Sequence, residues 1–106
     1  MPKESKGITA IPPQAKNLLK RVGENIERAR RHRRITRQAF ADRLYVSVPT
    51  VRRLEQGHPG VSLGVLASAL WALGLHNDLS RLAAAESDLI GQALWRRAQG
   101  GPDNDF

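Results

Sequence analysis

The chain has 106 residues, of which 41% are hydrophobic and 25% charged, and its formal net charge is +7. This length fits one domain with short tails, and the absence of cysteine excludes disulfides, thiolate metal sites and thiol nucleophiles. No apolar run approaches the roughly 20 residues that span a bilayer and the N-terminus shows no signal-peptide pattern, so we expect a cytoplasmic protein.

Residues 1–13 predict a flexible arm, because proline and glycine interrupt a polar stretch. A first helix is predicted over residues 13–33, where Leu19, Ile26 and other apolar residues recur at spacings of three and four. Its apolar face consists of Leu19, Val22, Ile26 and Ala29. We expect its polar residues on the other faces, in solvent: Lys16, Lys20, Arg21, Glu24, Glu27, Arg28, Arg30, Arg31 and Arg33.

Two short helices follow, and each begins after a hydroxyl side chain suited to an N-cap. Thr36 begins a helix that ends near residue 44, and Ser47 begins the next. Pro49 lies in the first turn of that helix, where its missing N–H costs nothing, and Gly57 ends it. The residues expected to face the core are Phe40, Ala41, Leu44, Val51 and Leu54.

Three more helices are predicted in the second half. The fourth extends from Ser62 to a left-handed cap at Gly74, a short fifth covers residues 77–85, and a sixth covers residues 87–98. Residues 77–98 are expected to pack on the domain or in a dimer, and residues 99–106 form a disordered tail. The expected inward residues are Val65, Leu66, Ala69, Leu70 and Leu73 in the fourth helix, and Leu89, Ala93 and Leu94 in the sixth.

Charge separates the two halves of the chain. Residues 1–60 hold fourteen basic and five acidic residues, whereas residues 61–106 hold three basic and five acidic ones. The first half therefore favours a surface that faces a polyanion, with a solvated basic surface as the alternative. The same two alternatives apply to the six arginines within residues 28–37, which form either a phosphate-contacting flank or a solvated helix end.

Residues 36–57 predict two helices that cross at a steep angle. Ala41 is the small residue at the crossing, and Val51 and Leu54 are the branched residues on the inner face of the second helix. The outer face then carries Val48, Pro49, Thr50, Arg52 and Arg53. A helix of this length fits the major groove of DNA with its N-terminal end toward the bases.

This segment resembles the helix-turn-helix of the Xre family, the type found in phage Cro and cI repressors. Residues 23–30 are similar to the family's first helix, and residues 53–57 resemble the Arg-x-Glu-x-Gly ending of its recognition helix. The resemblance implies an all-α, lambda-repressor-like domain of five to six helices over residues 14–76. It also implies a transcriptional repressor that binds double-stranded DNA at an inverted repeat as a homodimer.

Residue roles follow from the resemblance. The positions that face base edges are Val48, Pro49, Arg52 and Arg53, and those that contact phosphates are Arg34, Arg37, Gln38, Ser47 and Thr50. The chemistry agrees, because arginine suits guanine and valine packs on a thymine methyl. The alternative for Arg52 or Arg53 is an ion pair with Glu55 or Asp42.

The sequence departs from the family at two positions where glycine is usual, Arg34 and Tyr45. A positive φ at Tyr45 costs roughly 1 kcal/mol and leaves the tilt of the recognition helix open. The departures keep an alternative function open, a protein-interaction module that holds a partner and binds DNA weakly.

Residues 58–66 and 70–75 resemble small regulators that are paired with HipA-type kinase toxins. This implies a HipB-like antitoxin that represses its own operon and binds a toxin kinase. A phage-type or general repressor is the alternative.

No other site is predicted. His32, His58 and His76 are widely spaced and lack acidic partners at ligand spacing, so we expect no metal, and no cofactor-binding motif is present. The chain offers neither paired carboxylates nor a nucleophile with a base, so we expect no enzyme activity. For Trp71 and Trp95, core or dimer packing is favoured over base stacking.

Overall fold

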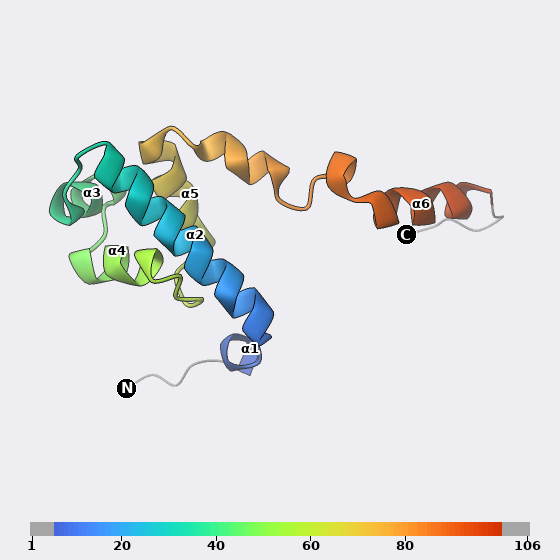
Figure 1. The fold of residues 1–106 in the computed structure, drawn as a ribbon, viewed down its shortest axis with the longest axis horizontal. Helices are drawn as coiled ribbons and strands as arrows, with labels where there is room; N and C mark the ends of the chain where they lie inside the picture. The colour runs from blue at the N-terminus through green and yellow to red at the C-terminus, as the bar shows by residue number, and fades with distance from the viewer. Residues whose placement is uncertain (1–5, 101–106) are drawn as a thin grey trace. The chain divides into compact units, whose positions relative to one another are not determined.

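The computed structural model describes residues 6–100, and every regular element in that range is helical. This confirms the predicted all-α class. The elements are α1 (Lys6–Thr9), α2 (Pro13–His32), α3 (Arg37–Leu44), α4 (Val48–Glu55), α5 (Leu63–Leu73), the 3-10 segments η1 (His76–Arg81) and η2 (Ala85–Ser87), and α6 (Leu89–Gln99). They form two units, residues 6–76 and residues 77–100, which are described separately (Figure 1).

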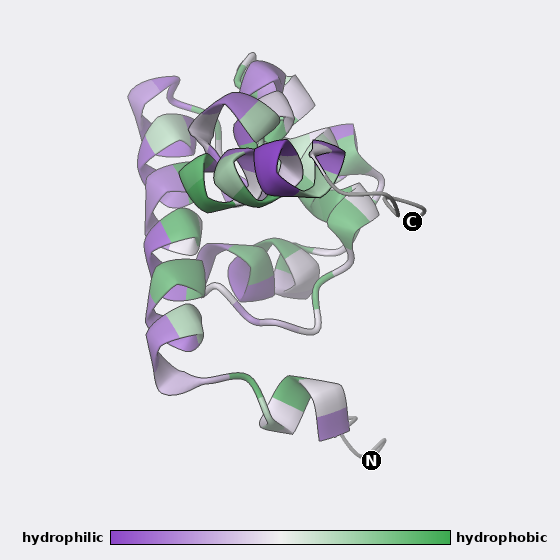
Figure 2. Cartoon of the chain, turned by 90° about the vertical axis from the view of Figure 1, so that its right-hand side faces the viewer, coloured by the Kyte–Doolittle hydropathy of each residue, from purple (hydrophilic) through white to green (hydrophobic). Residues whose placement is uncertain are grey.

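The first unit is built on α2, which packs against α4 and α5, while α3 packs against the same two helices. Figure 2 shows the hydrophobic residues of α2 toward the other helices and its hydrophilic residues on the outer side. Burial of each large apolar side chain contributes about 1.5–3 kcal/mol. The buried core consists of Ile26, Phe40, Ala41, Leu44, Val51, Leu54, Ala69 and Leu73, all of which were predicted to face inward.

Local capping sets the helix boundaries of this unit. The side chains of Thr36, Ser47 and Ser62 accept hydrogen bonds from the backbone N–H groups of Ala39, Thr50 and Val65. Gly74 ends α5 in the left-handed conformation, at φ 75°. These caps confirm the four predicted starts and stops at positions 36, 47, 62 and 74.

Three expectations for the first unit were wrong. Residues 6–9 form α1 within the segment predicted as a flexible arm. Val22 is exposed on α2, because Gly23 occupies the buried stripe beside it. Arg30 is buried rather than solvated, because Glu55 neutralises it. Gln99, the first residue of the predicted tail, belongs to α6, and residues 1–5 and 101–106 lie outside the described residues.

The second unit departs further from expectation. The predicted helix over residues 77–85 is replaced by η1 and η2. Two features explain this: the Ser80 hydroxyl donates to the Asn77 carbonyl, and Ala83 has a φ of 54°, which a continuous α-helix does not allow. Within this unit, described by itself, residues 77–100 contain no buried side chain, and the predicted packing of Leu89, Ala93 and Leu94 against the domain or in a dimer stays a prediction.

Candidate nucleic-acid interface

The predicted recognition helix α4 is anchored on its inner face and open on its outer face. Val51 and Leu54 are buried in the core, whereas Pro49, Arg52 and Arg53 are exposed. Val48 is half-buried and packs against the core, so only part of its side chain faces solvent. Of the four residues expected to face bases, three therefore lie fully on the open surface.

Close backbone contact fixes the end of α4 against α2. A β-carbon on Gly23 would meet the Glu55 carbonyl and would lie 2.6 Å from the Gly57 nitrogen. Gly57 has a φ of 71°, and a β-carbon there would lie 2.6 Å from the Lys20 nitrogen. Only glycine permits such an approach at both positions, so this pair of residues sets the distance between the two helices.

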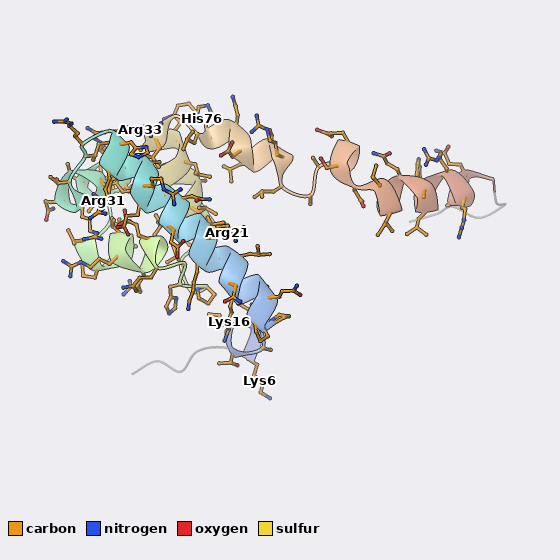
Figure 3. The ribbon with its side chains drawn as sticks, in the orientation of Figure 1. Lys6, Lys16, Arg21, Arg31, Arg33 and His76 are labelled. Atoms are coloured by element: carbon orange, nitrogen blue, oxygen red, sulfur yellow. The ribbon has the colours of Figure 1, made fainter. Side chains whose placement is uncertain are left out.

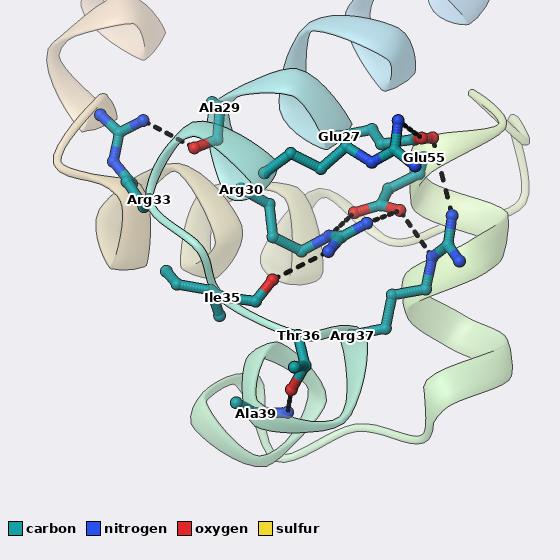
Figure 4. Close-up of polar contacts among 10 residues, drawn as sticks. Glu27, Ala29, Arg30, Arg33, Ile35, Thr36, Arg37, Ala39 and Glu55 are labelled. Carbon is teal, nitrogen blue, oxygen red and sulfur yellow. Dashed lines mark hydrogen bonds and ion pairs between the residues drawn. The ribbon is translucent and has the colours of Figure 1, made fainter.

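A buried ionic cluster fixes the orientation of α4 (Figure 4). The Arg30 guanidinium contacts both Glu55 oxygens, with Nε 2.6 Å from Oε2 and Nη2 3.2 Å from Oε1. Its remaining nitrogen, Nη1, donates to the Ile35 carbonyl at 2.8 Å. Arg30 on α2 thus connects α4 with the turn before α3, and every nitrogen of its guanidinium has a partner.

Arg37, which was expected to contact phosphate, belongs to the same cluster. Its Nε donates to Glu55 Oε1 at 3.0 Å, and its Nη2 lies 3.8 Å from Glu27 Oε2. Arg37 therefore lies between two carboxylates that it shares with Arg30 and Arg31. The contact with Glu55 connects Arg37 to α4, and its remaining exposed surface lies beside Arg52 and Gln56, which line the same surface hollow, so a phosphate contact by Arg37 stays a prediction.

Three polar side chains form a connected row along α4. The Ser47 and Thr50 hydroxyl oxygens are 3.0 Å apart, and Arg53 Nη2 donates to Thr50 Oγ1 at 3.2 Å. The alternative in which Arg53 pairs with Glu55 or Asp42 does not occur, because Arg30 and Arg37 hold Glu55 and Gln38 Nε2 donates to Asp42 at 3.0 Å. Thr50 instead orients the Arg53 guanidinium.

The run of six arginines does not form one patch. Arg30 is buried, Arg37 is held by carboxylates, and Arg31 lies 3.6 Å from Glu27. Figure 3 labels Lys16, Arg21 and Arg31 on α2 and Arg33 at its C-cap. Arg33 donates to the Ala29 carbonyl at 2.8 Å, which matches the predicted interaction of cations with a helix C-terminus.

The two positions where the family has glycine both adopt the left-handed conformation. Arg34 has a φ of 54° and Tyr45 a φ of 56° with a ψ of 40°. The prediction of a positive φ at Tyr45 is confirmed.

The buried role of Arg30 was missed from the sequence. One signal was present, because Arg30 lies four residues after Ile26 and thus on the buried stripe of α2. Its partner Glu55 is 25 residues away, and periodicity within one helix carries no information about it.

No group of three His, Asp or Glu side chains in residues 6–100 is placed to hold a metal ion. No helix in this range is long and apolar enough to cross a membrane. His58 accepts the Gly60 N–H at Nδ1, and His76 lies against the Trp71 ring.

Comparison with known proteins gives one match. A family model described as a helix-turn-helix domain matches residues 21–84, a range that includes α3, α4 and the turn between them. No curated protein and no solved structure matches the chain.

Proposed function

This chain belongs to the helix-turn-helix domain family, and from that premise we propose that it is a sequence-specific transcriptional repressor that binds an inverted-repeat operator as a homodimer. The observation that carries the proposal is the placement of α4. The glycine contact and the Arg30–Glu55–Arg37 cluster hold its inner side, and Pro49, Arg52 and Arg53 remain exposed.

In this proposal α4 enters the major groove with its N-terminal end toward the bases. Arg52 and Arg53 recognise guanine edges, and Pro49 with the exposed part of Val48 contacts thymine methyl groups. Gln38, Ser47, Thr50 and Arg34 bind phosphates, while Arg37 orients α4. The two recognition helices of a dimer would then lie roughly 34 Å apart, which is one turn of DNA.

Exposed apolar residues support the dimer part of the proposal. Leu63 and Trp71 on α5 are largely exposed, as are Ile90, Leu94 and Trp95 on α6. A unit without a buried side chain, such as residues 77–100, does not bury enough apolar surface to be stable alone. A second copy of the chain supplies the missing surface in our proposal.

Within the repressor class we propose an antitoxin that represses its own operon and binds a toxin kinase. The same exposed apolar residues favour a second candidate, a module that mainly holds a partner protein and binds DNA weakly. A neighbouring reading frame that encodes a kinase, followed by co-purification of the two proteins, would support the antitoxin.

Fluorescence anisotropy of the full chain on its own upstream DNA tests the proposal, with a scrambled duplex as the control. We expect tighter binding to the upstream DNA, and a steep fall in affinity with salt because phosphate contacts release counterions. Equal, weak binding to both duplexes would contradict the repressor and favour the partner-binding module.

A further inference from the structure

Tyr45 occupies a costly position in the turn between α3 and α4. It adopts the left-handed conformation, which disfavours every residue with a β-carbon and particularly a bulky one. Its side chain is also 96% exposed. Glycine would satisfy the same backbone without the strain.

The fold of residues 6–100 offers no compensation for this cost. The turn is closed by backbone groups, since the N–H of Val46 donates to the Ala41 carbonyl at 3.0 Å and the N–H of Tyr45 to the Asp42 carbonyl at 3.3 Å. Within this range the Tyr45 ring has no aromatic neighbour and its hydroxyl has no hydrogen bond. Left-handed non-glycine residues cluster at ligand-binding sites, so the strained and exposed Tyr45 is a candidate contact.

The position of Tyr45 indicates which ligand. It lies two residues before Ser47, the N-cap of α4, and so at the end of the helix that enters the major groove in the proposed function. At the same end Ser47 is exposed and Thr50 is half-buried, and their hydroxyl oxygens lie 3.0 Å apart. A phenol is a neutral hydrogen-bond donor, and tyrosine is one of the side chains that bind DNA phosphates.

We propose that Tyr45 is a DNA-backbone contact, in which its hydroxyl donates a hydrogen bond to a phosphate oxygen at the edge of the groove that α4 enters. This inference rests on the proposed function and deepens it. It assigns the phenol to positioning rather than to base recognition, because a phosphate contact carries no sequence information.

Two variants of the full chain separate the hydroxyl from the backbone strain. Tyr45→Phe removes only the hydroxyl, and we expect it to weaken operator binding about three- to tenfold per half-site. The slope of log affinity against log salt should stay unchanged, because a neutral donor releases no counterion. Tyr45→Gly should weaken binding at least as much while it raises the thermal midpoint by about 2–6 °C, since the strain disappears.

Ala83→Gly is the matched control. Ala83 has the same left-handed conformation, at φ 54°, but lies far along the chain in the second unit, so its replacement should leave operator affinity unchanged. If Tyr45→Phe binds the operator with the same affinity as the wild type, the proposed hydrogen bond to phosphate is overturned. If Tyr45→Gly binds the operator as tightly as the wild type or more tightly, any contact of the Tyr45 side chain with DNA is overturned. If the wild type itself does not distinguish its operator from a scrambled duplex, the proposed function fails as well.

Discussion

The guanidinium of Arg30 and the carboxylate of Glu55 face each other across the contact between α2 and α4, with their side chains only 6% and 1% exposed. Two-point contacts between arginine and a carboxylate fix direction as well as distance. This pair therefore determines how α4 is rotated on the domain and which of its residues point outward.

Glu55→Ala should destabilise the domain by about 3–5 kcal/mol, because it leaves the Arg30 charge buried without a partner. Urea unfolding monitored by circular dichroism measures the change. The matched control is Glu27→Ala, which removes a more exposed carboxylate 3.8 Å from Arg37 and should cost less than about 1 kcal/mol. Similar losses in the two variants would mean that the buried pair is not important for stability.

Gly23→Ala should destabilise the domain by about 1–3 kcal/mol or more, although alanine is the better helix former. The reason is the absence of room for a β-carbon between α2 and the end of α4. Gly64→Ala is the control, because a β-carbon there has no neighbour closer than Ser62 Oγ at 3.8 Å; it should stabilise α5 by about 0.5–1 kcal/mol. Thermal unfolding of both variants measures these opposite changes in stability. A Gly23→Ala variant that is more stable than the wild type would disprove the close approach of α2 to the end of α4.

Arg53→Ala should weaken specific DNA binding by about 1–3 kcal/mol and relax the preference for one base. The same loss is not expected from Arg21→Ala, which removes an equal charge from the exposed side of α2. Anisotropy on a set of operators with single base changes measures both effects. Unchanged affinity for Arg53→Ala would exclude Arg53 from base recognition.

Trp71→Ala should weaken self-association without changing base preference. Trp71 is 69% exposed and contacts the His76 ring at a centroid distance of 4.4 Å, so its loss leaves the core of the first unit intact. Sedimentation equilibrium measures the monomer–dimer constant, and Trp71→Phe, which keeps an aromatic ring, should retain more of the association. An identical monomer–dimer constant for the wild type, Trp71→Ala and Trp71→Phe would exclude this face of α5 from the dimer surface.

Local signals in the sequence were sufficient to place α2 to α5. Capping hydroxyls at positions 36, 47 and 62 and the glycine at position 74 act on backbone groups within three or four residues, so contiguous sequence carries the information. The apolar spacing of α3, α4 and α5 identified the core for the same reason.

Residues 77–100 show where such reasoning ends. The apolar spacing of α6 predicts a stripe, but a stripe becomes a buried face only when another surface covers it, and the periodicity of one helix does not identify that surface. The predicted helix over residues 77–85 likewise depended on propensity, and side-chain bonding and a left-handed Ala83 replaced it with two 3-10 segments.

The candidate interface also contains features that the sequence predicts and features that depend on tertiary packing. Its outward residues, Pro49, Arg52 and Arg53, follow from the periodicity of one short helix and could be predicted from the sequence. Burial of Arg30, the contact of Arg37 with Glu55 and the glycine contact depend on groups 18 to 37 residues apart in the chain. Folding brings these groups together, and a buried charge is tolerated only once its partner is in place, so these features emerge only from the packed structure.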